Sequence, residues 1–241
     1  MLTYEAAAKW LNENQGVVGL ALFVATLAFG WLTGIFAALR RRPKFKLRLI
    51  AGPTFCCTYP TGEVHNDHPV HRTAFALYLS VANIGSAASS IESVAVGYHC
   101  HLRPISWLWV RYTFGWLWLR DQIAAIHDFQ AKIGENIKIY PFLTQSSILS
   151  AKPSSTFLQP GESTNGVVYF EQSDSWGGFL PLQGPKGARI KVELRDTFGG
   201  SHSAKFNIDA VSLEHARNYN PSFGKTLAEL RNRPLPHDAD G

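Results

Sequence analysis

Five histidines lie in two short stretches of the sequence, and their side chains are common metal ligands. "HNDHPVH" contains His65, His68 and His71, and "HCH" contains His99 and His101. Imidazoles, with a carboxylate or thiolate beside them, suit zinc. The spacing matches no closed zinc motif, and histidines in a loop rich in Asn, Asp and Pro are more often solvated turn residues. A metal-binding sensor or enzyme is therefore the alternative function, and the expectation is that no cofactor is bound.

Two "WLW" triplets in "PISWLWVRYTFGWLWLRDQ" hold Trp107, Trp109, Trp116 and Trp118, with Arg111 between them. An indole ring can be buried while its N–H stays in water, so tryptophans beside arginines suit a membrane–water interface. The same residue types form hot spots in protein interfaces. A third interpretation is that these tryptophans close one end of a β-sheet core. Contact with lipid or with a protein partner is the functional prediction for these five residues.

The sequence contains no recognisable catalytic motif. We find no nucleophile elbow, phosphate-binding glycine loop, dinucleotide fingerprint or metalloprotease helix. The glycines of "GESTNG" and "SWGG" are typical of turns between strands. Carboxylates are scattered singly along the chain, and none is paired at helical spacing in a plausible pocket. We therefore predict that the protein is not an enzyme and assign no catalytic residue.

An apolar segment near the N-terminus predicts a transmembrane helix. Residues 16–39, "GVVGLALFVATLAFGWLTGIFAAL", run for about 24 residues without a charge, which is enough to cross a hydrocarbon core of about 30 Å. The segment lacks the basic start and short apolar core of a cleaved signal peptide. We predict a single-pass protein of the inner (plasma) membrane, with residues 1–15 as an extracytoplasmic segment.

Six basic residues follow the apolar segment directly. They are Arg40, Arg41, Arg42, Lys44, Lys46 and Arg48. Such a cluster marks the cytoplasmic side of a membrane helix and is attracted to anionic lipid. We therefore predict a basic juxtamembrane segment over residues 40–48, contact with membrane lipid, and a cytoplasmic C-terminal domain. A reversed topology, with the domain on the envelope side, is the alternative.

The distribution of charge argues against a nucleic-acid partner. The net charge of the chain is +5. Residues 1–39 carry one basic and two acidic side chains, and the six juxtamembrane cations account for the whole excess. The remaining 16 basic and 16 acidic residues cancel, so the domain is neutral. The three cysteines, Cys56, Cys57 and Cys100, agree with a reducing compartment because adjacent cysteines rarely pair.

Small residues recur within the apolar segment at intervals of four: Thr26, Gly30, Gly34 and Ala38. Gly30 and Gly34 form a GxxxG motif, which lets two membrane helices approach closely. Pairing with a second copy or with another membrane subunit is the prediction for these two glycines. The alternative is that they are ordinary glycines of a membrane helix.

Beyond residue 44 the sequence predicts β-strands separated by turns. Apolar and polar residues alternate in "KFKLRLIAG", and Phe75, Leu77, Leu79 and Val81 share one strand face. "NIKIYPFL" and "FLQPGESTNGVVYFE" read as further strands, and "ARIKVELRDTFGGSHSAKFNIDAV" reads as a hairpin turning at residues 196–201. We predict a mainly β fold, an antiparallel β-sandwich over residues 49–211.

The strand and turn motifs resemble those of bacterial immunoglobulin-like modules. The resemblance is carried by "LYLSVANIGSAASSIESVAV", "FLQPGESTNGVVYFE" and "IKVELRDTFGG", and covers residues 47–211. It implies an immunoglobulin-like sandwich that works by interaction, and it carries no catalytic residue. The sequence departs from the pattern in an insertion at about residues 103–134.

Helices are predicted at two places in or after this domain. "DQIAAIHDFQAKIGEN", residues 121–136, has apolar residues at helical spacing and a stop at Gly134, so it predicts an amphipathic helix within the insertion. Residues 212–241 predict short C-terminal helices, the first capped by Ser212 and the second starting near Lys225, and a tail. The expected function is a membrane-anchored domain for protein interaction or an accessory domain of a membrane complex.

Overall fold

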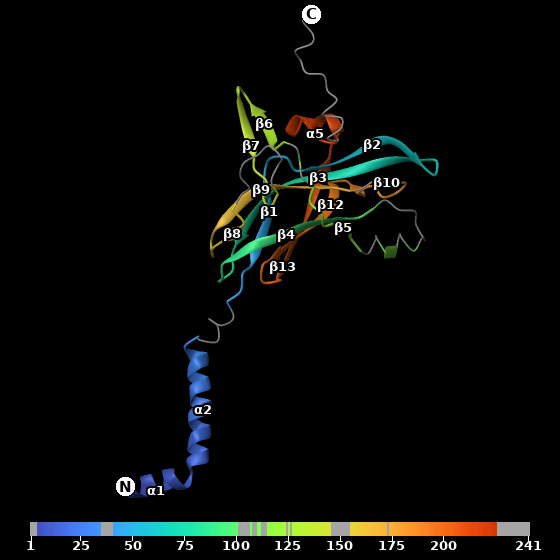
Figure 1. The fold of residues 1–241 in the computed structure, drawn as a ribbon. Helices are drawn as coiled ribbons and strands as arrows, with labels where there is room; N and C mark the ends of the chain where they lie inside the picture. Colours follow the sequence, from blue (N-terminus) through green and yellow to red (C-terminus); the bar gives the residue numbers. More distant parts are fainter. Residues whose placement is uncertain are drawn as a thin grey trace, which may run out of the picture. The chain divides into compact units, whose positions relative to one another are not determined.

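The computed structural model describes residues 4–34, 41–100, 107, 110–111, 115–123, 125, 127–145, 155–172 and 174–225. The chain divides into two compact units, Met1–Arg42 and Pro43–Gly241. The described residues are mainly β, with an apolar N-terminal helix and a short C-terminal helix (Figure 1). The predicted fold class is thus confirmed at this level.

The N-terminal unit is helical. Its helices are α1, Tyr4–Glu13, and α2, Gln15–Leu32. α2 is long and apolar enough to cross a membrane, and none of its residues is buried. Its 18 residues span about 27 Å. The helix ends earlier than predicted, because Gly34 adopts a left-handed φ of 74° and its N–H bonds to the Trp31 carbonyl.

The second unit is built from thirteen described strands. They are β1 Phe45–Leu49, β2 Phe55–His65, β3 His68–Asn83, β4 Ser89–Tyr98, β5 Leu117–Leu119, β6 Phe129–Ile133, β7 Asn136–Tyr140, β8 Phe157–Leu158, β9 Ser163–Glu171, β10 Ser175–Trp176, β11 Gln183–Gly184, β12 Gly187–Asp196 and β13 Ser201–Ala210. β3 is the centre of one layer: β1 and β2 follow one another along one edge, and β9 and β10 lie along the other. β13, β12, β4 and β5 form the second layer in that order.

The two layers are joined by one short parallel contact. Asp209 and Ala210 of β13 pair with Phe55 and Cys56 of β2. The predicted antiparallel arrangement holds for the long strand pairs of both layers, whereas this contact makes the whole sheet mixed. The short strands β8 and β11 extend β4 and β12.

The main hydrophobic core lies between the two layers. Its β3 residues alternate as predicted, and all four are fully buried: Phe75, Leu77, Leu79 and Val81. Opposite them are apolar side chains of β4 and β12: Val94, Val96, Tyr98, Ile190, Val192 and Leu194. Burial of β12 on one face only explains why its sequence alternates between apolar and polar residues.

A second core covers the other face of the β3 layer. Ala74 and Ala76 of β3 pack there with Phe129, Tyr140 and Phe223. The β6–β7 hairpin and helix α5, Leu213–Tyr219, form this covering layer, which Figure 1 shows above β3 and β9, with β4, β5 and β13 below them. β3 is therefore buried on both faces, which its apolar sequence "TAFALYLSVA" reflects.

The predicted helix over residues 121–136 is wrong. Residues 129–133 form strand β6, which turns at Gly134 with a φ of 60° and pairs with β7. Phe129 pairs with Tyr140, and both are buried in the second core. This long-range packing overrides the helical spacing of the apolar residues. The predicted cap at Ser212 is confirmed, because its hydroxyl accepts the His215 N–H at 3.2 Å. The second predicted C-terminal helix lies outside the described residues beyond Lys225.

Candidate functional site

β5 directs two of the predicted tryptophans to the outside of the second layer. Leu117 and Leu119 pack against the main core, whereas Trp116 and Trp118 alternate with them and are half-buried. These two tryptophans therefore do not close the core, which was one of the three interpretations. Trp107 is 80% exposed, and Trp109 lies outside the described residues.

Gly97 of β4 leaves room for Trp116 and Trp118 on the outer side of the sheet. Gly97 of β4 pairs with Trp118, and a Cβ at Gly97 would lie 3.1 Å from the Trp116 Cβ and from two Trp118 ring carbons. Such contacts are closer than ordinary van der Waals distances, so the Trp118 ring and the Trp116 Cβ use the space that the missing side chain leaves.

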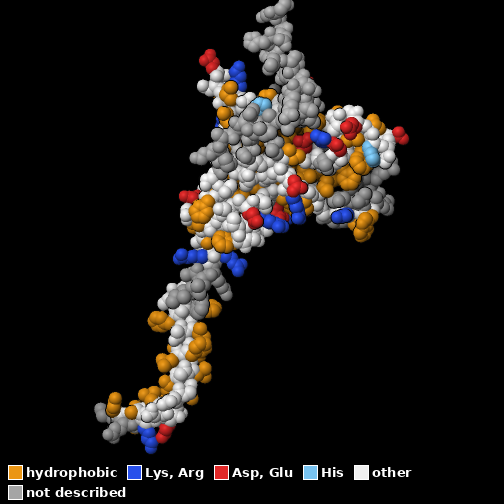
Figure 2. All heavy atoms as spheres, viewed as in Figure 1, with side chains coloured by type: hydrophobic (Ala, Val, Ile, Leu, Met, Phe, Trp, Pro, Cys, Tyr) orange, Lys and Arg blue, Asp and Glu red, His pale blue; other side chains and the backbone are white. Residues whose placement is uncertain are grey.

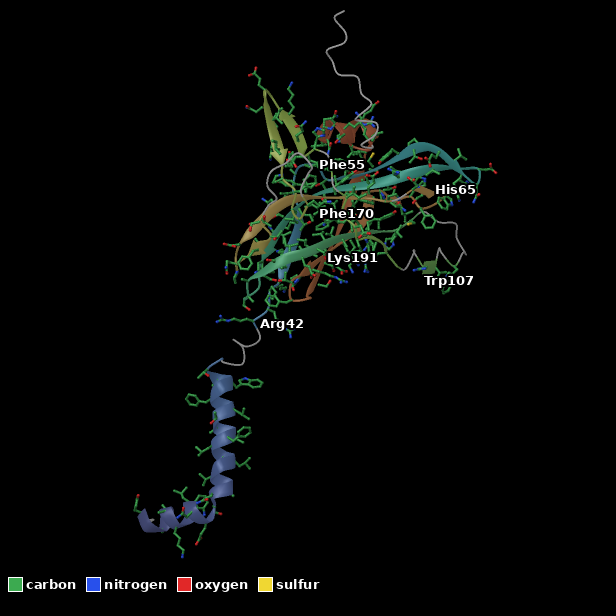
Figure 3. All side chains as sticks on the ribbon, viewed as in Figure 1. Arg42, Phe55, His65, Trp107, Phe170 and Lys191 are labelled. Atoms are coloured by element: carbon green, nitrogen blue, oxygen red, sulfur yellow. The ribbon has the colours of Figure 1, made fainter. Side chains whose placement is uncertain are left out.

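Two lysines continue this surface across the sheet. Gly97 pairs with Lys191 of β12, and Lys191 pairs with Lys205 of β13, so one row crosses four strands. The Lys191 Nζ lies 5.6 Å from the Trp118 ring centre, and the Lys205 Nζ lies 5.9 Å from that of Trp116. Both distances allow cation–π attraction. Figure 3 labels Phe55, Phe170 and Lys191 at successive levels of the domain.

Further charges surround this row. Arg189, Glu193 and Arg195 share the outer face of β12 with Lys191, since each alternates with a buried residue. Arg120 follows β5 directly and is exposed. We call these residues the aromatic–basic face: Trp116, Trp118, Arg120, Arg189, Lys191, Glu193, Arg195 and Lys205. Five of its side chains are basic and one is acidic, so the surface favours an anionic partner.

The middle of the face is hollowed. β4 contributes small side chains there, Ser93, Ala95 and Gly97, between the large residues of β5 and β12. A hollow of about 180 Å³ is lined by Ser93, Val94, Ala95, Trp118, Arg120, Glu193 and Arg195. The Glu193 carboxylate accepts from the Arg195 Nε at 3.3 Å, so it partly neutralises that cation. The hollow can receive a side chain or head group of moderate size.

The histidines predicted as metal ligands separate into different environments. His65 and His68 pair across the tip of the β2–β3 hairpin, and the His65 ring lies 4.2 Å from that of Trp176. His99 stacks on Trp116 at 4.0 Å on the aromatic–basic face. Within the described ranges, no group of three or more His, Cys, Asp or Glu side chains is arranged to hold a metal ion. His101 lies outside those ranges.

His71 differs from its neighbours in the hairpin. It pairs with Pro60 and Ser175, and its position on β3 turns it to the opposite face from His68. Its buried Nε2 has no hydrogen-bond partner within the described part of the chain.

The juxtamembrane cations are divided between the two units. Arg40 lies outside the described residues, and Arg41 and Arg42 are exposed. Lys44 is exposed just before β1, and Lys46 and Arg48 are exposed positions of β1 itself. These last two alternate with buried core residues, so strand geometry explains the alternating sequence.

The GxxxG motif does not lie within one helix. Gly30 is part of α2, whereas Gly34 follows the end of the helix at Leu32. Ala38 lies outside the described residues. The small-residue stripe inside α2 is thus limited to Thr26 and Gly30, and the pairing prediction now depends on Gly30.

A second, larger hollow adjoins the aromatic–basic face. Its volume is about 550 Å³, and it is lined by Arg72, Trp118, Leu119, Arg120, Asp121, Ile123, Glu171, Gln172, Gly224 and Lys225. We call it the side cavity. It shares Trp118 and Arg120 with the face, and strands β3, β5 and β9 contribute to its wall.

One wall of the side cavity is a hydrogen-bonded polar network. The Glu171 carboxylate accepts from the hydroxyls of Tyr59 and Tyr169, and the Arg72 guanidinium lies 3.5 Å from it. Arg72 also pairs with Asp174 and holds the pKa of that carboxyl below its usual value. Burial, together with the neighbouring Glu171 carboxylate, raises the pKa of both tyrosines. The tyrosines are therefore neutral donors, and the network serves to hold the wall in place.

The cysteines offer no reactive thiolate. All three are buried and free of disulfides. Burial raises the pKa of Cys56 and Cys57 to about 11 and that of Cys100 to about 12. Thiols with such pKa values stay protonated near neutral pH, so they are poor nucleophiles and poor metal ligands.

Comparison with known families and proteins does not extend this description. No family model matches the sequence, and a search of curated proteins found no similar one. Sequence reasoning identified Trp116 and Trp118 but missed Lys191 and Lys205 beside them. The alternation in "ARIKVELRD" carried a signal for the first of these lysines, because it places Arg189, Lys191, Glu193 and Arg195 on one strand face.

Proposed function

We propose that the chain is a single-pass membrane protein whose β domain binds an acidic protein partner through the aromatic–basic face. The observation that carries this proposal is the row formed by Trp118, Gly97, Lys191 and Lys205 across four strands. Tryptophan and arginine, which the face combines, are residue types enriched in protein interfaces, and the two lysines of the row add positive charge that suits an acidic partner. The domain is an accessory or docking subunit of a membrane complex.

The membrane placement is part of the same proposal. α2 has the length and hydropathy of a span, and the cations that follow it favour a cytoplasmic location for the β domain at the plasma membrane. The two packed β layers agree with the resemblance to bacterial immunoglobulin-like modules, which are mostly adhesive or docking elements. A tag at the C-terminus, probed by protease in sealed membrane vesicles of known orientation, tests the topology. If protease removes the tag only when it is added on the extracytoplasmic side, the β domain lies on that side and the proposed topology is wrong.

The partner is tested by purification of the tagged full-length protein in a mild non-ionic detergent, followed by mass spectrometry. A form lacking residues 1–39 is purified beside it. We expect a stoichiometric partner to stay with both forms, since recognition by the face does not require the helix. A partner that binds only the full-length form would place recognition in the N-terminal unit instead. Absence of any partner from both forms would contradict the docking function.

A matched pair of lysine variants connects the partner to the face. Lys191→Glu and Lys205→Glu reverse the charge of the face, and we expect them to abolish retention of the partner. Lys138→Glu is the control, because Lys138 also lies over an aromatic ring, 5.0 Å from the Tyr140 ring centre, but belongs to the β6–β7 hairpin. If all three variants retain the partner equally, the aromatic–basic face is not part of the interface with that partner.

Anionic lipid is the second candidate partner, because indoles and cations on one surface also suit a lipid head-group region. This alternative predicts that the Lys191→Glu and Lys205→Glu variants lose contact between the domain and anionic nanodiscs of phosphatidylglycerol. Cross-linking from the face to lipid, measured in phosphatidylglycerol and phosphatidylcholine nanodiscs, distinguishes it from protein docking. Equal cross-linking in both lipids would count against an electrostatic lipid contact.

A further inference from the structure

The side cavity is large enough to hold a small molecule. Its volume of about 550 Å³ lies within the range of about 300–1,000 Å³ typical of ligand sites. The cavity opens to solvent, since Arg120, Asp121 and Ile123 of its lining are exposed, so a ligand could enter it from outside.

The wall of the cavity is pre-formed. Glu171 receives hydrogen bonds from Tyr59 and Tyr169 and an ion pair from Arg72, so its charge is already compensated. Gly224 has a φ of 69°, and a Cβ there would lie 3.1 Å from the Tyr59 ring. This close approach holds the segment that carries Lys225 against the wall. A ligand entering the cavity would meet a surface that needs little rearrangement.

Three other groups lining the cavity have hydrogen-bonding capacity to spare. Gln172 is 92% buried, since its exposed fraction is 8%, and its Oε1 accepts the Tyr98 hydroxyl at 2.6 Å. Its amide nitrogen is a further hydrogen-bond donor, and Gln172 is one of the residues that line the cavity. Arg120 and Lys225 form no ion pair within the part of the chain that the structure describes. All three groups are donors, and two are cations.

The remaining lining is apolar, apart from one carboxylate. Trp118, Leu119 and Ile123 supply the apolar surface, and Asp121 supplies the carboxylate that is not engaged in the network. The cavity therefore offers a ligand two cations, one amide and one carboxylate, beside an indole and two aliphatic side chains. Such a set favours an anion that also carries an apolar body.

We infer that the side cavity binds a small amphipathic organic anion, a carboxylate or phosphate monoester attached to an apolar or aromatic body. Arg120, Lys225 and the amide of Gln172 would receive the oxyanion, and the body would lie against Trp118 and Ile123. This site goes beyond partner binding by the aromatic–basic face. It does not use Lys191 or Lys205, so the two functions can fail separately.

The test uses full-length protein in a non-ionic detergent and four probes: phenyl phosphate, phenylacetate, benzyl alcohol and inorganic phosphate. Isothermal titration calorimetry and Trp fluorescence are the readouts. We expect saturable binding of at least one aromatic anion with a Kd below about 1 mM, and binding at least roughly tenfold weaker for the neutral alcohol and for inorganic phosphate. The two aromatic anions show which oxyanion is preferred. Failure of both to saturate, or equal binding of inorganic phosphate, would overturn the inference.

Variants then place the bound anion. Arg120→Gln and Lys225→Gln remove one cation each from the cavity lining, and we expect each to weaken the preferred anion by roughly tenfold. Lys132→Gln is the control, because this exposed cation of β6 neither lines the cavity nor belongs to the aromatic–basic face. Unchanged affinity in both cavity variants, or an equal loss in the Lys132→Gln control, would overturn the assignment. Lys191→Glu should leave anion binding intact even where it abolishes partner binding.

Discussion

The side chain of Gln145 completes the edge of strand β9 by bonding both backbone groups of Tyr169. Its Nε2 donates to the Tyr169 carbonyl at 3.1 Å, and its Oε1 accepts the Tyr169 N–H at 3.0 Å. The same Nε2 donates to the Ile123 carbonyl at 2.7 Å. A buried glutamine thus takes the place of a neighbouring strand and ties the loop at Ile123 to the sheet.

Replacing Gln145 with leucine should therefore destabilise the domain strongly. The variant leaves the N–H of the buried Tyr169 without a partner, at a cost of about 1–3 kcal/mol, whereas the Tyr169 carbonyl keeps only the Ile123 N–H at 3.4 Å. Urea unfolding followed by circular dichroism measures the effect, with Gln159→Leu at an exposed position as the control. A loss no greater than in that control would show that water or another group replaces the amide.

Asp196 should make the stability of the domain depend on acid pH. Burial alone would raise its pKa, but hydrogen bonds from His202, Gly200 and Phe198 together hold that pKa below its usual value. The ionised carboxylate therefore contributes stability that is complete above the unfolded pKa of about 3.9 and is lost as pH falls through the lower folded value. The His202 Nδ1 accepts the Phe45 N–H at 3.3 Å, so the same pair connects β13 with β1.

The variant Asp196→Asn should remove this dependence. We expect it to be less stable than the wild type by about 1–3 kcal/mol at pH 7, and the difference should shrink towards pH 3. Thermal unfolding at several pH values measures the stability difference at pH 7 and its decrease towards pH 3. Asp209→Asn, a change at an exposed position of β13, serves as the control. A constant difference across this pH range would show that the carboxylate charge does not contribute.

The three thiols should react only after unfolding. Because burial raises the pKa of Cys56, Cys57 and Cys100 to about 11, 11 and 12, each is protonated at pH 8. Ellman's reagent added to the native protein should detect none of them within minutes, and in guanidinium chloride it should detect all three. Rapid reaction of a native thiol would mean that the core around it opens readily.

Enlarging Gly97 should disturb the aromatic–basic face. A valine there would overlap Trp116 and Trp118, whose atoms already lie 3.1 Å from the position of a Cβ. We expect a loss of stability of about 1–3 kcal/mol and weaker retention of the partner, because the indoles must move. Trp fluorescence should shift to longer wavelength as the rings become more exposed. Unchanged emission and partner binding would show that the sheet adjusts without moving the tryptophans.

The histidine hypothesis predicts bound metal, and the geometry of the described histidines predicts none. His65 and His99 are engaged with Trp176 and Trp116 respectively, on separate parts of the domain. Figure 3 labels His65 at the hairpin, away from Lys191. Elemental analysis of the purified full-length protein should find less than about a tenth of an equivalent of zinc, iron, copper or nickel. If the wild type instead holds a full equivalent of one of these metals, and the double variant His65→Ala, His68→Ala loses it, the metal-binding hypothesis is supported.

The net charge of the β domain does not reveal the aromatic–basic face. Basic and acidic side chains lie close together on the visible part of the β domain in Figure 2, and the domain as a whole is neutral in the sequence. Lys191 and Lys205 are 14 positions apart along the chain and become neighbours only through the β12–β13 register. A sum over the sequence cannot reveal such a cluster, because charges elsewhere cancel it.

Local chemistry in the sequence determined the apolar helix, the alternation of β1, β3 and β12, the turn after Asp196 and the cap at Ser212. Each of these depends on residues within a few positions of one another, where periodicity and capping act directly. Tertiary structure alone decided that residues 129–133 form a strand, because Phe129 gains more from packing with Tyr140 than from a local helix. It also decided which side of the sheet Trp116 and Trp118 occupy, and it brought Arg72, Arg120, Gln172 and Lys225 around one cavity. These relations join residues that are distant in the chain, so only pairing and packing of the whole domain could establish them.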